Sequence, residues 1–313
     1  MKQQRTAIVL HGGAGTILRS KMNPEKEIQY RNGLSEALRI GRNILEQGGE
    51  ALDAAEATVR ALEDNPLYNA GKGAVYAGDG KHHLDASIMR GDNREAGSVA
   101  GVKGVKNPIS LARAVMEQSR YVMMIGEGAE AFAKEQGHEM VPPAYFHDEL
   151  RYQQWQQIKD TQLTQLDHAD KGEKNWSTVG AVALDQKGNI ASATSTGGMT
   201  NKRYGRIGDT PIIGSGCYAN NQTCGVCCTG HGEPFMRSVV AYDLSCLIEY
   251  KGLSLAEAAQ HLVQEKLVAF GGEGGLIALD ADGNYVLEFN CEGMYRAAWV
   301  SGQEEYVGIY KNE

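Results

Sequence analysis

The stretch that decides the fold is residues 164–184, where TQLDHADKGEKNWS is followed directly by TVGAVAL. The polar part, residues 164–177, contains almost no apolar side chains. It predicts a mobile surface linker, which we expect to extend over residues 140–177. The apolar part, residues 178–184, is typical of a strand buried on both faces. A cut between Ser177 and Thr178 would fall where the linker meets the buried strand.

Strand pairs of one kind recur along the chain. Residues 180–190 (GAVALDQKGNI) and 275–285 (GLIALDADGNY) both predict a hairpin with a D-x-x-G-N turn, and residues 85–102 predict a third. Helical spacing of apolar residues predicts further elements. The expected helices cover residues 24–47, 50–64, 128–136, 233–250 and 254–267, with one more opened by Asn107 as N-cap and Pro108 at the first position. These elements predict an α+β fold in which helices cover antiparallel sheets.

The composition argues against several classes of protein. With 31 basic and 39 acidic residues, the chain carries a net charge of −8, which argues against a nucleic-acid binder. No apolar run approaches the roughly 18–20 residues of a membrane helix, and the run at residues 7–10 is too short for a signal peptide. All six cysteines lie at or after Cys217. We therefore expect no membrane partner and reduced thiols in the cytoplasm.

The cysteine cluster offers one alternative function. Cys224, Cys227 and Cys228 resemble half of a zinc site, which would make the chain a thiol or metal protein. No second pair with matching spacing accompanies them, and the small, apolar neighbours are typical of a strand. The expected interpretation is buried structural thiols.

Thr178 is the candidate nucleophile. A threonine hydroxyl is a weak nucleophile without a base beside it. As the first residue of a chain, Thr178 would supply its own base, because an α-amino group with a pKa near about 8 is partly neutral at neutral pH. The simpler interpretation is a β-branched residue that opens a strand. The residues alone leave both interpretations open.

A series of motifs resembles the isoaspartyl peptidase/plant-type L-asparaginase family of N-terminal nucleophile (Ntn) hydrolases. The motifs occur in family order along nearly the whole chain. Besides the strand that begins at Thr178, they are HGGAG at 11–15, NAGKG at 69–73, LDAS at 84–87, GSVAG at 97–101, NPISLAR at 107–113, VMMIGEGA at 122–129, TSTGGMTNK at 194–202, GRIGD at 205–209, GSGCYAN at 214–220 and CTGHGE at 228–233. The resemblance implies a single domain over residues 1–313, folded as a four-layer αββα sandwich.

The resemblance also implies a mechanism. Self-cleavage between Ser177 and Thr178 would give an α subunit, 1–177, and a β subunit, 178–313. Thr178 would hydrolyse β-aspartyl (isoaspartyl) dipeptides and L-asparagine to L-aspartate through an acyl-enzyme. The Thr196 hydroxyl would bond the nucleophile, and the Thr229 hydroxyl with the Gly230 N–H would stabilise the oxyanion. Ser177 stands where the family has Gly or Asp, which bears on the rate of cleavage.

Substrate recognition is expected from Arg206 and Asp209. A guanidinium binds the α-carboxylate of an amino acid in two places, and a carboxylate accepts from its ammonium group. A surface ion pair is the simpler interpretation. The resemblance adds Gly232, Asn69 and Gly13 as residues that line the site.

No cofactor is implied for catalysis, but the resemblance implies a structural sodium ion. The ion would be bound by main-chain carbonyls of the 62–72 loop, which are those of Leu62, Glu63, Asn65, Tyr68, Ala70 and Lys72. The resemblance further implies a dimer of αβ units acting on small-molecule substrates. Two related alternatives stay open: an N-glycosylasparagine amidase of the same fold, and an uncleaved protein that binds aspartyl or asparaginyl ligands.

Overall fold

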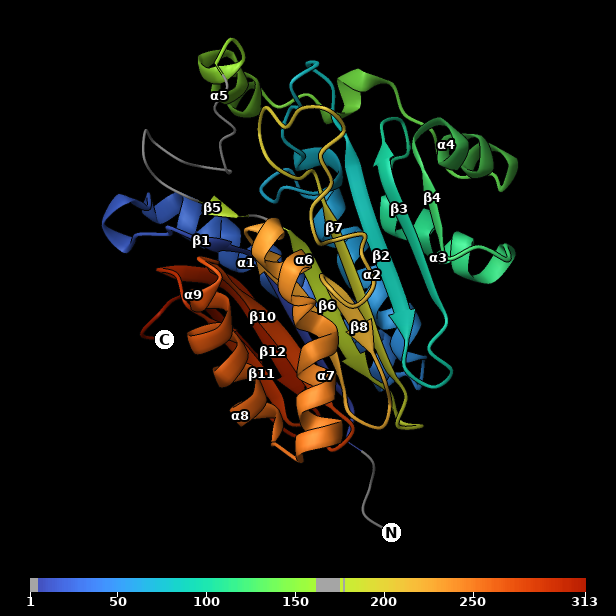
Figure 1. Cartoon of the computed structure of the whole chain (residues 1–313), viewed down its shortest axis with the longest axis vertical. Coiled ribbons are helices and arrows are strands. Elements are labelled where there is room, and N and C mark those ends of the chain that lie inside the picture. The colour runs from blue at the N-terminus through green and yellow to red at the C-terminus, as the bar shows by residue number, and fades with distance from the viewer. Residues whose placement is uncertain (1–4, 162–174, 177) are drawn as a thin grey trace.

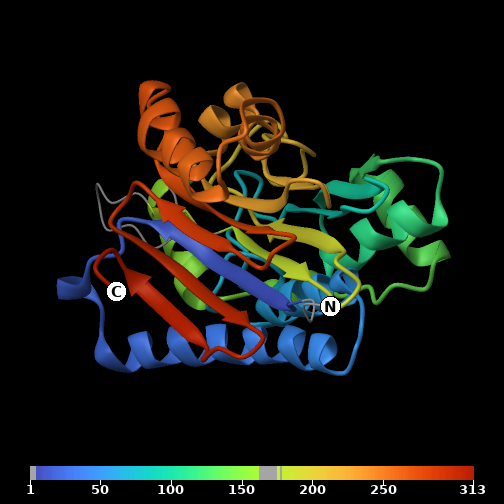
Figure 2. The same ribbon diagram turned by 90° about the horizontal axis from the view of Figure 1, so that it is seen from below.

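Two β-sheets lie face to face between two layers of helices (Figures 1 and 2). The computed structural model describes residues 5–161, the backbone of 175–176, and 178–313. Figure 2 shows the layers edge-on, with α1 beneath the large sheet and the late helices above the small one. The four-layer αββα sandwich expected from the resemblance is confirmed.

The larger sheet has nine strands within the described residues. Its order is β13-β12-β1-β6-β7-β2-β3-β4, and β5 pairs with β1. The strands are β1 Ala7–Gly15, β2 Leu84–Arg90, β3 Ala96–Val102, β4 Met123–Ile125, β5 Asn175–Trp176, β6 Val179–Leu184, β7 Ile190–Thr196, β12 Gly293–Val300 and β13 Tyr306–Tyr310. All neighbours are antiparallel except β3 and β4. The prediction of wholly antiparallel sheets is wrong for this pair, because a helix connects the two strands and returns the chain in the same direction.

The smaller sheet is antiparallel, with the order β11-β10-β9-β8 among the described strands. Its strands are β8 Cys217–Ala219, β9 Cys224–Gly230, β10 Gly274–Asp280 and β11 Tyr285–Phe289. The two sheets approach closely at Gly225, where an added Cβ would lie only 2.4 Å from Val182 Cγ1. The three predicted hairpins are confirmed as β6–β7, β10–β11 and β2–β3.

Helices cover the outer face of each sheet. α1 (Pro24–Glu46), α2 (Ala51–Asp64) and α3 (Pro108–Gln118) pack on the large sheet, and α7 (Val240–Lys251) and α8 (Leu255–Gln260) pack on the small one. The shorter helices are α4 (Gly126–Glu135), α5 (Glu149–Ile158), α6 (Gly232–Ser238) and α9 (Leu267–Ala269), with single turns at Arg19–Lys21, Gly71–Gly73 and Pro143–Phe146 and a π-helical segment at His261–Lys266. Among the described residues, no helix has the length and apolar character needed to cross a membrane.

Three helix predictions need correction. The helix expected over 233–250 is broken at Val239, which has a φ of +50° and separates α6 from α7. The Asn107 side chain does not cap α3 but donates to Glu63 and Asp64, while the Glu63 carboxylate accepts the Ile109 N–H. Within the linker predicted over 140–177, the Pro143–Phe146 turn and α5 are regular structure; residues 162–174 and Ser177 lie outside the described residues.

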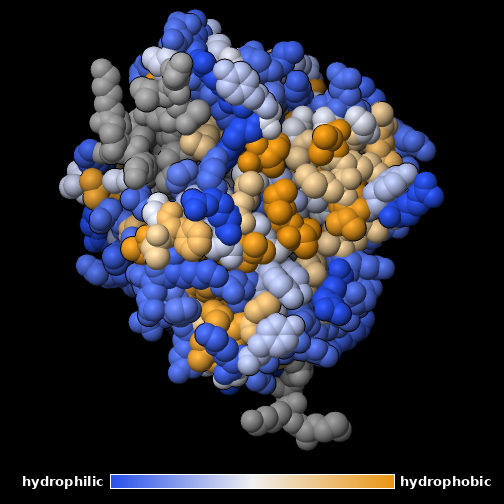
Figure 3. Space-filling view, viewed as in Figure 1, coloured by the Kyte–Doolittle hydropathy of each residue, from blue (hydrophilic) through white to orange (hydrophobic). Residues whose placement is uncertain are grey.

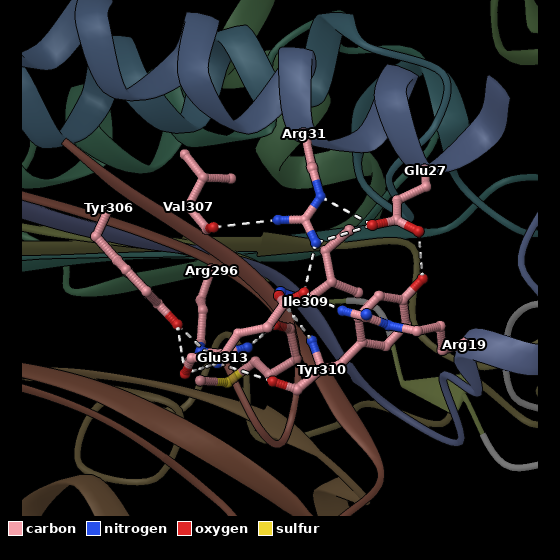
Figure 4. Close-up of polar contacts among 10 residues, drawn as sticks. Arg19, Glu27, Arg31, Arg296, Tyr306, Val307, Ile309, Tyr310 and Glu313 are labelled. Atoms are coloured by element: carbon pink, nitrogen blue, oxygen red, sulfur yellow. Dashed lines mark hydrogen bonds and ion pairs between the residues drawn. The ribbon is translucent and has the colours of Figure 1, made fainter. Parts of the chain in front are cut away.

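The two halves of the chain are interleaved. Strand β1 pairs with β6 on one side and β12 on the other. Where α1 packs against β12 and β13, Arg31 of α1 donates to the Glu27 and Glu313 carboxylates and to the Val307 carbonyl oxygen, as Figure 4 shows. A break before Thr178 would therefore leave the segments on either side of it held together by sheet pairing and packing.

Candidate active site

The register of the large sheet brings Thr178 and Thr196 together. Val179 pairs with Ser195 across β6 and β7, so Thr178 comes opposite Thr196 at the ends of these strands. Both side chains are buried, Thr178 with 7% of its surface exposed. The Thr178 Oγ1 lies 3.3 Å from the Thr210 Oγ1, whereas the Thr196 hydroxyl accepts from the Gly198 N–H at 2.9 Å.

The small sheet packs on the strand that follows Thr178. Gly225 faces Val182, and Cys227, two residues later on β9, faces Gly180, two residues earlier on β6. The same spacing, extended by two residues, predicts that Thr229 faces Thr178. Thr229 is fully buried, and its hydroxyl has no hydrogen-bond partner within the described part of the chain. A buried hydroxyl without a partner is costly, so an unpaired one beside a nucleophile suits a ligand atom.

Gly230 and Gly232, which follow Thr229, lie where the backbone closely approaches neighbouring groups. Gly230 has a φ of +156°, and a Cβ there would lie 2.5 Å from the Glu273 carbonyl oxygen. Gly232 begins α6, and a Cβ on it would lie 2.9 Å from Arg206 Nη2 and 3.1 Å from the Asp209 nitrogen. Any larger residue at position 232 would collide with the loop that carries Arg206 and Asp209.

Arg206 and Asp209 do not form a surface ion pair with each other. Nε and Nη2 of Arg206 each donate to the Glu233 carboxylate at 2.8 Å. Burial opposes ionisation of Glu233, but hydrogen bonds from His231 and Arg206 hold its pKa far below the ordinary value. Sequence analysis missed Glu233 as the partner of Arg206, because the two residues are far apart in the chain.

Asp209 is the most unusual charge in the site. It is buried, with 3% of its surface exposed, and its Oδ2 has no hydrogen-bond partner among the described residues. Burial raises the pKa of Asp209 to about 7. A buried carboxylate oxygen that has no partner within the protein can accept a hydrogen bond from the ammonium group of a ligand.

Asn69 contacts the turn that follows Thr196, whereas Gly13 lies at the bulge of β1. The Asn69 Nδ2 donates to the Gly198 carbonyl at 2.7 Å, and its main-chain oxygen accepts from Gly197 at 2.9 Å. Asn69 therefore holds the turn that follows Thr196. Gly13 has a φ of +114° at the bulge of β1, a conformation that favours glycine.

A buried ion pair supports the same turn from the other side. Lys202 Nζ lies 3.3 Å from Asp85 Oδ2 and donates to the His83 carbonyl at 2.8 Å. The Lys202 side chain lies directly beneath Gly198, where an added Cβ would come within 2.6 Å of Nζ. The Gly197–Gly198 turn is thus fixed by Asn69 and by Lys202.

Two further residues beside Thr178 were missed from the sequence. Thr210 contacts the Thr178 hydroxyl and directly follows Asp209, so its adjacency to a predicted residue was the available signal. His11 is fully buried against Gly180, where a Cβ would lie 2.5 Å from its Nε2. Burial lowers the pKa of His11 to about 3, so the ring is neutral at physiological pH.

The 62–72 loop has a geometry suited to a small cation. A Cβ on Gly71 would lie 2.5 Å from the Glu63 carbonyl oxygen, and one on Gly73 would lie 2.1 Å from that of Tyr68. These glycines leave a cradle lined by main-chain oxygens, the ligand type that hard cations prefer. The Glu63 side chain accepts instead from the Ser195 hydroxyl at 2.6 Å and the Ile109 N–H at 3.0 Å, and burial raises its pKa to about 8.

The cysteine cluster lies in the core between the sheets. Cys227 Sγ donates to the Ala181 and Ala193 carbonyls at 3.4 and 3.3 Å. Burial raises the pKa of Cys224 to about 12. Buried, protonated thiols of this kind behave as small apolar side chains.

Comparison with known proteins decides the family, since the model of the family described as asparaginase matches residues 4–309. The chain belongs to the asparaginase family. The isoaspartyl peptidase of Escherichia coli strain K12 is 51% identical over 313 residues, covering 99% of this chain and 97% of that protein. The plant-type L-asparaginase of Pyrococcus horikoshii is 42% identical, covering 96% and 98%. The isoaspartyl peptidase/L-asparaginase of Xenopus laevis is 40% identical, covering 99% and 96%.

The asparaginase match extends across the junction before Thr178 and includes every site residue described above. Thr178 directly precedes β6, Thr196 ends β7 and Thr229 lies in β9, whereas Arg206 and Asp209 come from one loop. The family resemblance predicted from the sequence is therefore confirmed over nearly the whole chain.

Proposed function

We propose that this protein hydrolyses β-aspartyl dipeptides and L-asparagine to L-aspartate, with Thr178 as an N-terminal nucleophile released by self-cleavage after Ser177. The observation that carries the proposal is the contact of the Thr178 hydroxyl with Thr210, the neighbour of Asp209, together with two buried groups that have no partner among the described residues, the Thr229 hydroxyl and the Asp209 carboxylate. These groups match the three demands of the reaction, which are a nucleophile, an oxyanion donor and a receptor for the substrate ammonium group.

The first half-reaction forms an ester on Thr178. The Thr178 oxygen attacks the side-chain carbonyl carbon of the aspartyl group, and its proton passes to the Thr178 α-amine. The carbonyl oxygen becomes an oxyanion within reach of the Thr229 hydroxyl and the Gly230 N–H. The tetrahedral intermediate collapses, the C–N bond breaks, and the amine leaves with the proton held by the α-amine.

The second half-reaction releases aspartate. Water attacks the ester carbonyl and gives a proton to the Thr178 α-amine, and the same donors stabilise the second oxyanion. When the ester bond breaks, the Thr178 oxygen takes a proton and the free enzyme is restored. Thr210 contacts the Thr178 hydroxyl, and Thr196, which comes opposite Thr178 in the register of β6 and β7, would help to orient it.

The charged loop selects the substrate. Arg206 keeps one edge of its guanidinium for the substrate α-carboxylate, because Glu233 occupies the edge formed by Nε and Nη2. Asp209 accepts from the substrate ammonium group. A substrate without free α-groups would leave Asp209 buried and unpaired, which disfavours internal peptide bonds.

We propose that the sodium ion expected from the resemblance binds in the 62–72 loop. The main-chain oxygens of Leu62, Glu63, Asn65, Tyr68, Ala70 and Lys72 would hold it. Bound there, the cation would stabilise the loop that positions Asn69, which in turn holds the turn after Thr196.

We propose further that two αβ units assemble. Support comes from apolar residues left exposed at the open edge of the large sheet, where β4 lies. They are Tyr121, Val122, Met123 and Ile125. Figure 3 shows apolar side chains gathered over the same side of the molecule, which α6 and α7 leave uncovered. The compartment we propose is the cytoplasm, supported by six unpaired cysteines within residues 178–313.

Intact-mass measurement under denaturing conditions tests the proposal, combined with an assay of aspartate release. We expect the 33.9 kDa chain to give two species, one of which begins at Thr178, together with turnover of a β-aspartyl dipeptide. A single intact species that binds aspartate without turnover would contradict the proposal and support an uncleaved binding protein.

A further inference from the structure

A tight turn between Thr196 and Asp209 holds a tyrosine in an unusual backbone conformation. The Arg206 N–H donates to the Arg203 carbonyl at 2.9 Å, which closes a turn over Tyr204 and Gly205. Tyr204 has a φ of +56° and Gly205 a φ of +70°. Turns with two left-handed central residues favour Asn and Gly, so Tyr204 is held in strain.

Within the described part of the chain, the Tyr204 ring is not buried by any packing contact. Its surface is 100% exposed, although large aromatic side chains normally bury much of their area. A residue that adopts an unfavourable φ without burying its side chain is better explained by a function than by folding.

The turn is anchored on both sides. Arg203 Nη2 donates to the main-chain oxygens of Lys159 at 2.9 Å and Thr161 at 2.5 Å, at the end of α5. On the other side, Arg206 is held by its paired hydrogen bonds to Glu233. The Tyr204 backbone is therefore fixed, and Tyr204 lies two positions before Arg206, the residue proposed to bind the substrate carboxylate, in the same turn.

The proposed reaction divides the substrate into two parts. The aspartyl part is bound by Arg206 and Asp209 and attacked by Thr178, and both Asp209 and Thr178 are buried. The leaving residue lies beyond the bond that breaks, on the side of the substrate away from these buried groups. An exposed aromatic ring on the same turn as Arg206 offers that residue a rigid apolar surface at a small entropic cost.

We propose that Tyr204 is a specificity-determining residue whose ring contacts the leaving residue of β-aspartyl dipeptides and favours apolar and aromatic leaving residues over glycine. This inference rests on the proposed function. It assigns a preference that the buried part of the site cannot supply, because that part contacts only the aspartyl group shared by all these substrates.

The test compares substrates that differ only in the leaving group. Self-cleaved protein would be assayed with L-asparagine, β-aspartyl-glycine, β-aspartyl-leucine and β-aspartyl-phenylalanine. We expect the kcat/KM of the unaltered protein to be about tenfold higher for β-aspartyl-phenylalanine than for β-aspartyl-glycine. L-Asparagine serves as the internal reference, since ammonia cannot contact the ring.

Two variants separate the ring from the backbone. Tyr204→Asn removes the ring but retains a residue that suits the left-handed turn, and Tyr204→Phe retains the ring. We expect Tyr204→Asn to lose the tenfold preference, mainly through a higher KM for β-aspartyl-phenylalanine, with L-asparagine hydrolysis changed by less than about twofold. Tyr204→Phe should keep the preference.

Other outcomes would overturn the inference in distinguishable ways. An equal loss for all substrates in Tyr204→Asn would mean that the residue only positions the loop. An unchanged preference, with a change in oligomeric state by light scattering, would mean that a second copy covers the ring. If the unaltered protein hydrolyses none of the four compounds, the proposed function fails and this inference fails with it.

Discussion

The two sides of the candidate site are built in different ways. Thr178, Thr196 and Thr229 stand at strand ends, where register and sheet stacking determine their positions. Arg206 and Asp209 stand on a loop held by paired hydrogen bonds to Glu233 and to the segment that follows α5. Strand ends are backed by many cooperative contacts, whereas a loop depends on a few.

This difference teaches which kinetic constant each side controls. The strand side is expected to supply the chemistry, so changes there should lower kcat. The loop side is expected to supply affinity, so changes there should raise KM. The predictions below test this division, beginning with the largest expected effect.

Thr178→Ala should remove both self-cleavage and turnover, because the variant has no hydroxyl to attack the carbonyl. We expect aspartate release to fall by at least about 10³-fold. Intact mass and an aspartate assay measure the two effects. Thr178→Ser is the control, since it keeps the hydroxyl and, once cut, the amine. Substantial dipeptide hydrolysis by the Ala variant would contradict the assignment.

Thr229→Val should lower kcat by about 10²–10³-fold with little change in KM. Valine has nearly the same shape as threonine but lacks the hydroxyl proposed to stabilise the oxyanion. The fold should tolerate it, since the Thr229 hydroxyl has no hydrogen-bond partner among the described residues. Thr223→Val is the matched control beside the other end of β9, where the hydroxyl bonds Ser245. The control should lose stability and keep kcat. If Thr229→Val instead lost stability and kept kcat, Thr229 would have no role in the chemistry.

Asp209→Asn should lower kcat/KM by about 10²-fold, mostly through KM, because the substrate ammonium group loses its ionic partner. In the unaltered protein, kcat/KM should also fall as the pH decreases below about 7, since burial raises the pKa of Asp209 to about 7 and the protonated acid cannot pair with the ammonium group. The Asn variant should lack this part of the pH dependence. A large kcat loss at constant KM would break the division between the two sides.

The raised pKa of Asp209 also leads to a prediction about the stability of the fold. Its pKa is higher in the folded chain, about 7, than the ordinary 3.8, so the folded state binds this proton more tightly. The carboxyl group therefore destabilises the fold progressively as the pH rises from about 4 to about 7. The Tm difference between Asp209→Asn and the unaltered protein should grow over this range. Parallel Tm curves would contradict the raised pKa.

Gly225→Ala should have the smallest effect on activity. Its added methyl group would meet Val182 and Ile190 between the sheets, which should destabilise the protein by about 1–3 kcal/mol. Chemical unfolding measures this loss. Gly128→Ala in α4 is the control, because no atom lies within 4 Å of its added Cβ, and it should be neutral or stabilising. A change in KM larger than the change in kcat would contradict the division of the site.

The sequence alone predicted the local elements well where a residue pattern carried the signal. The D-x-x-G-N turns located two hairpins, and apolar spacing located α1, α2 and α4 within about two residues of their ends. The pattern failed at α5, which has little apolar periodicity and buries only Arg151. The roles of Thr196, Arg206 and Asp209 came from family motifs, since no local pattern distinguishes a catalytic threonine from a structural one.

What the sequence by itself determined is therefore three hairpins, most of the longer helices, the boundary between polar and apolar residues before Thr178, and the family. Those properties follow from residue order, because hydrophobic period, turn residues and motif order are local. Only the tertiary structure decided that Thr210 touches Thr178, that Glu233 holds Arg206 and that the Asp209 carboxylate is buried without a partner. These depend on the register of two stacked sheets and on contacts between distant segments, and no local pattern of residues encodes the distance between them.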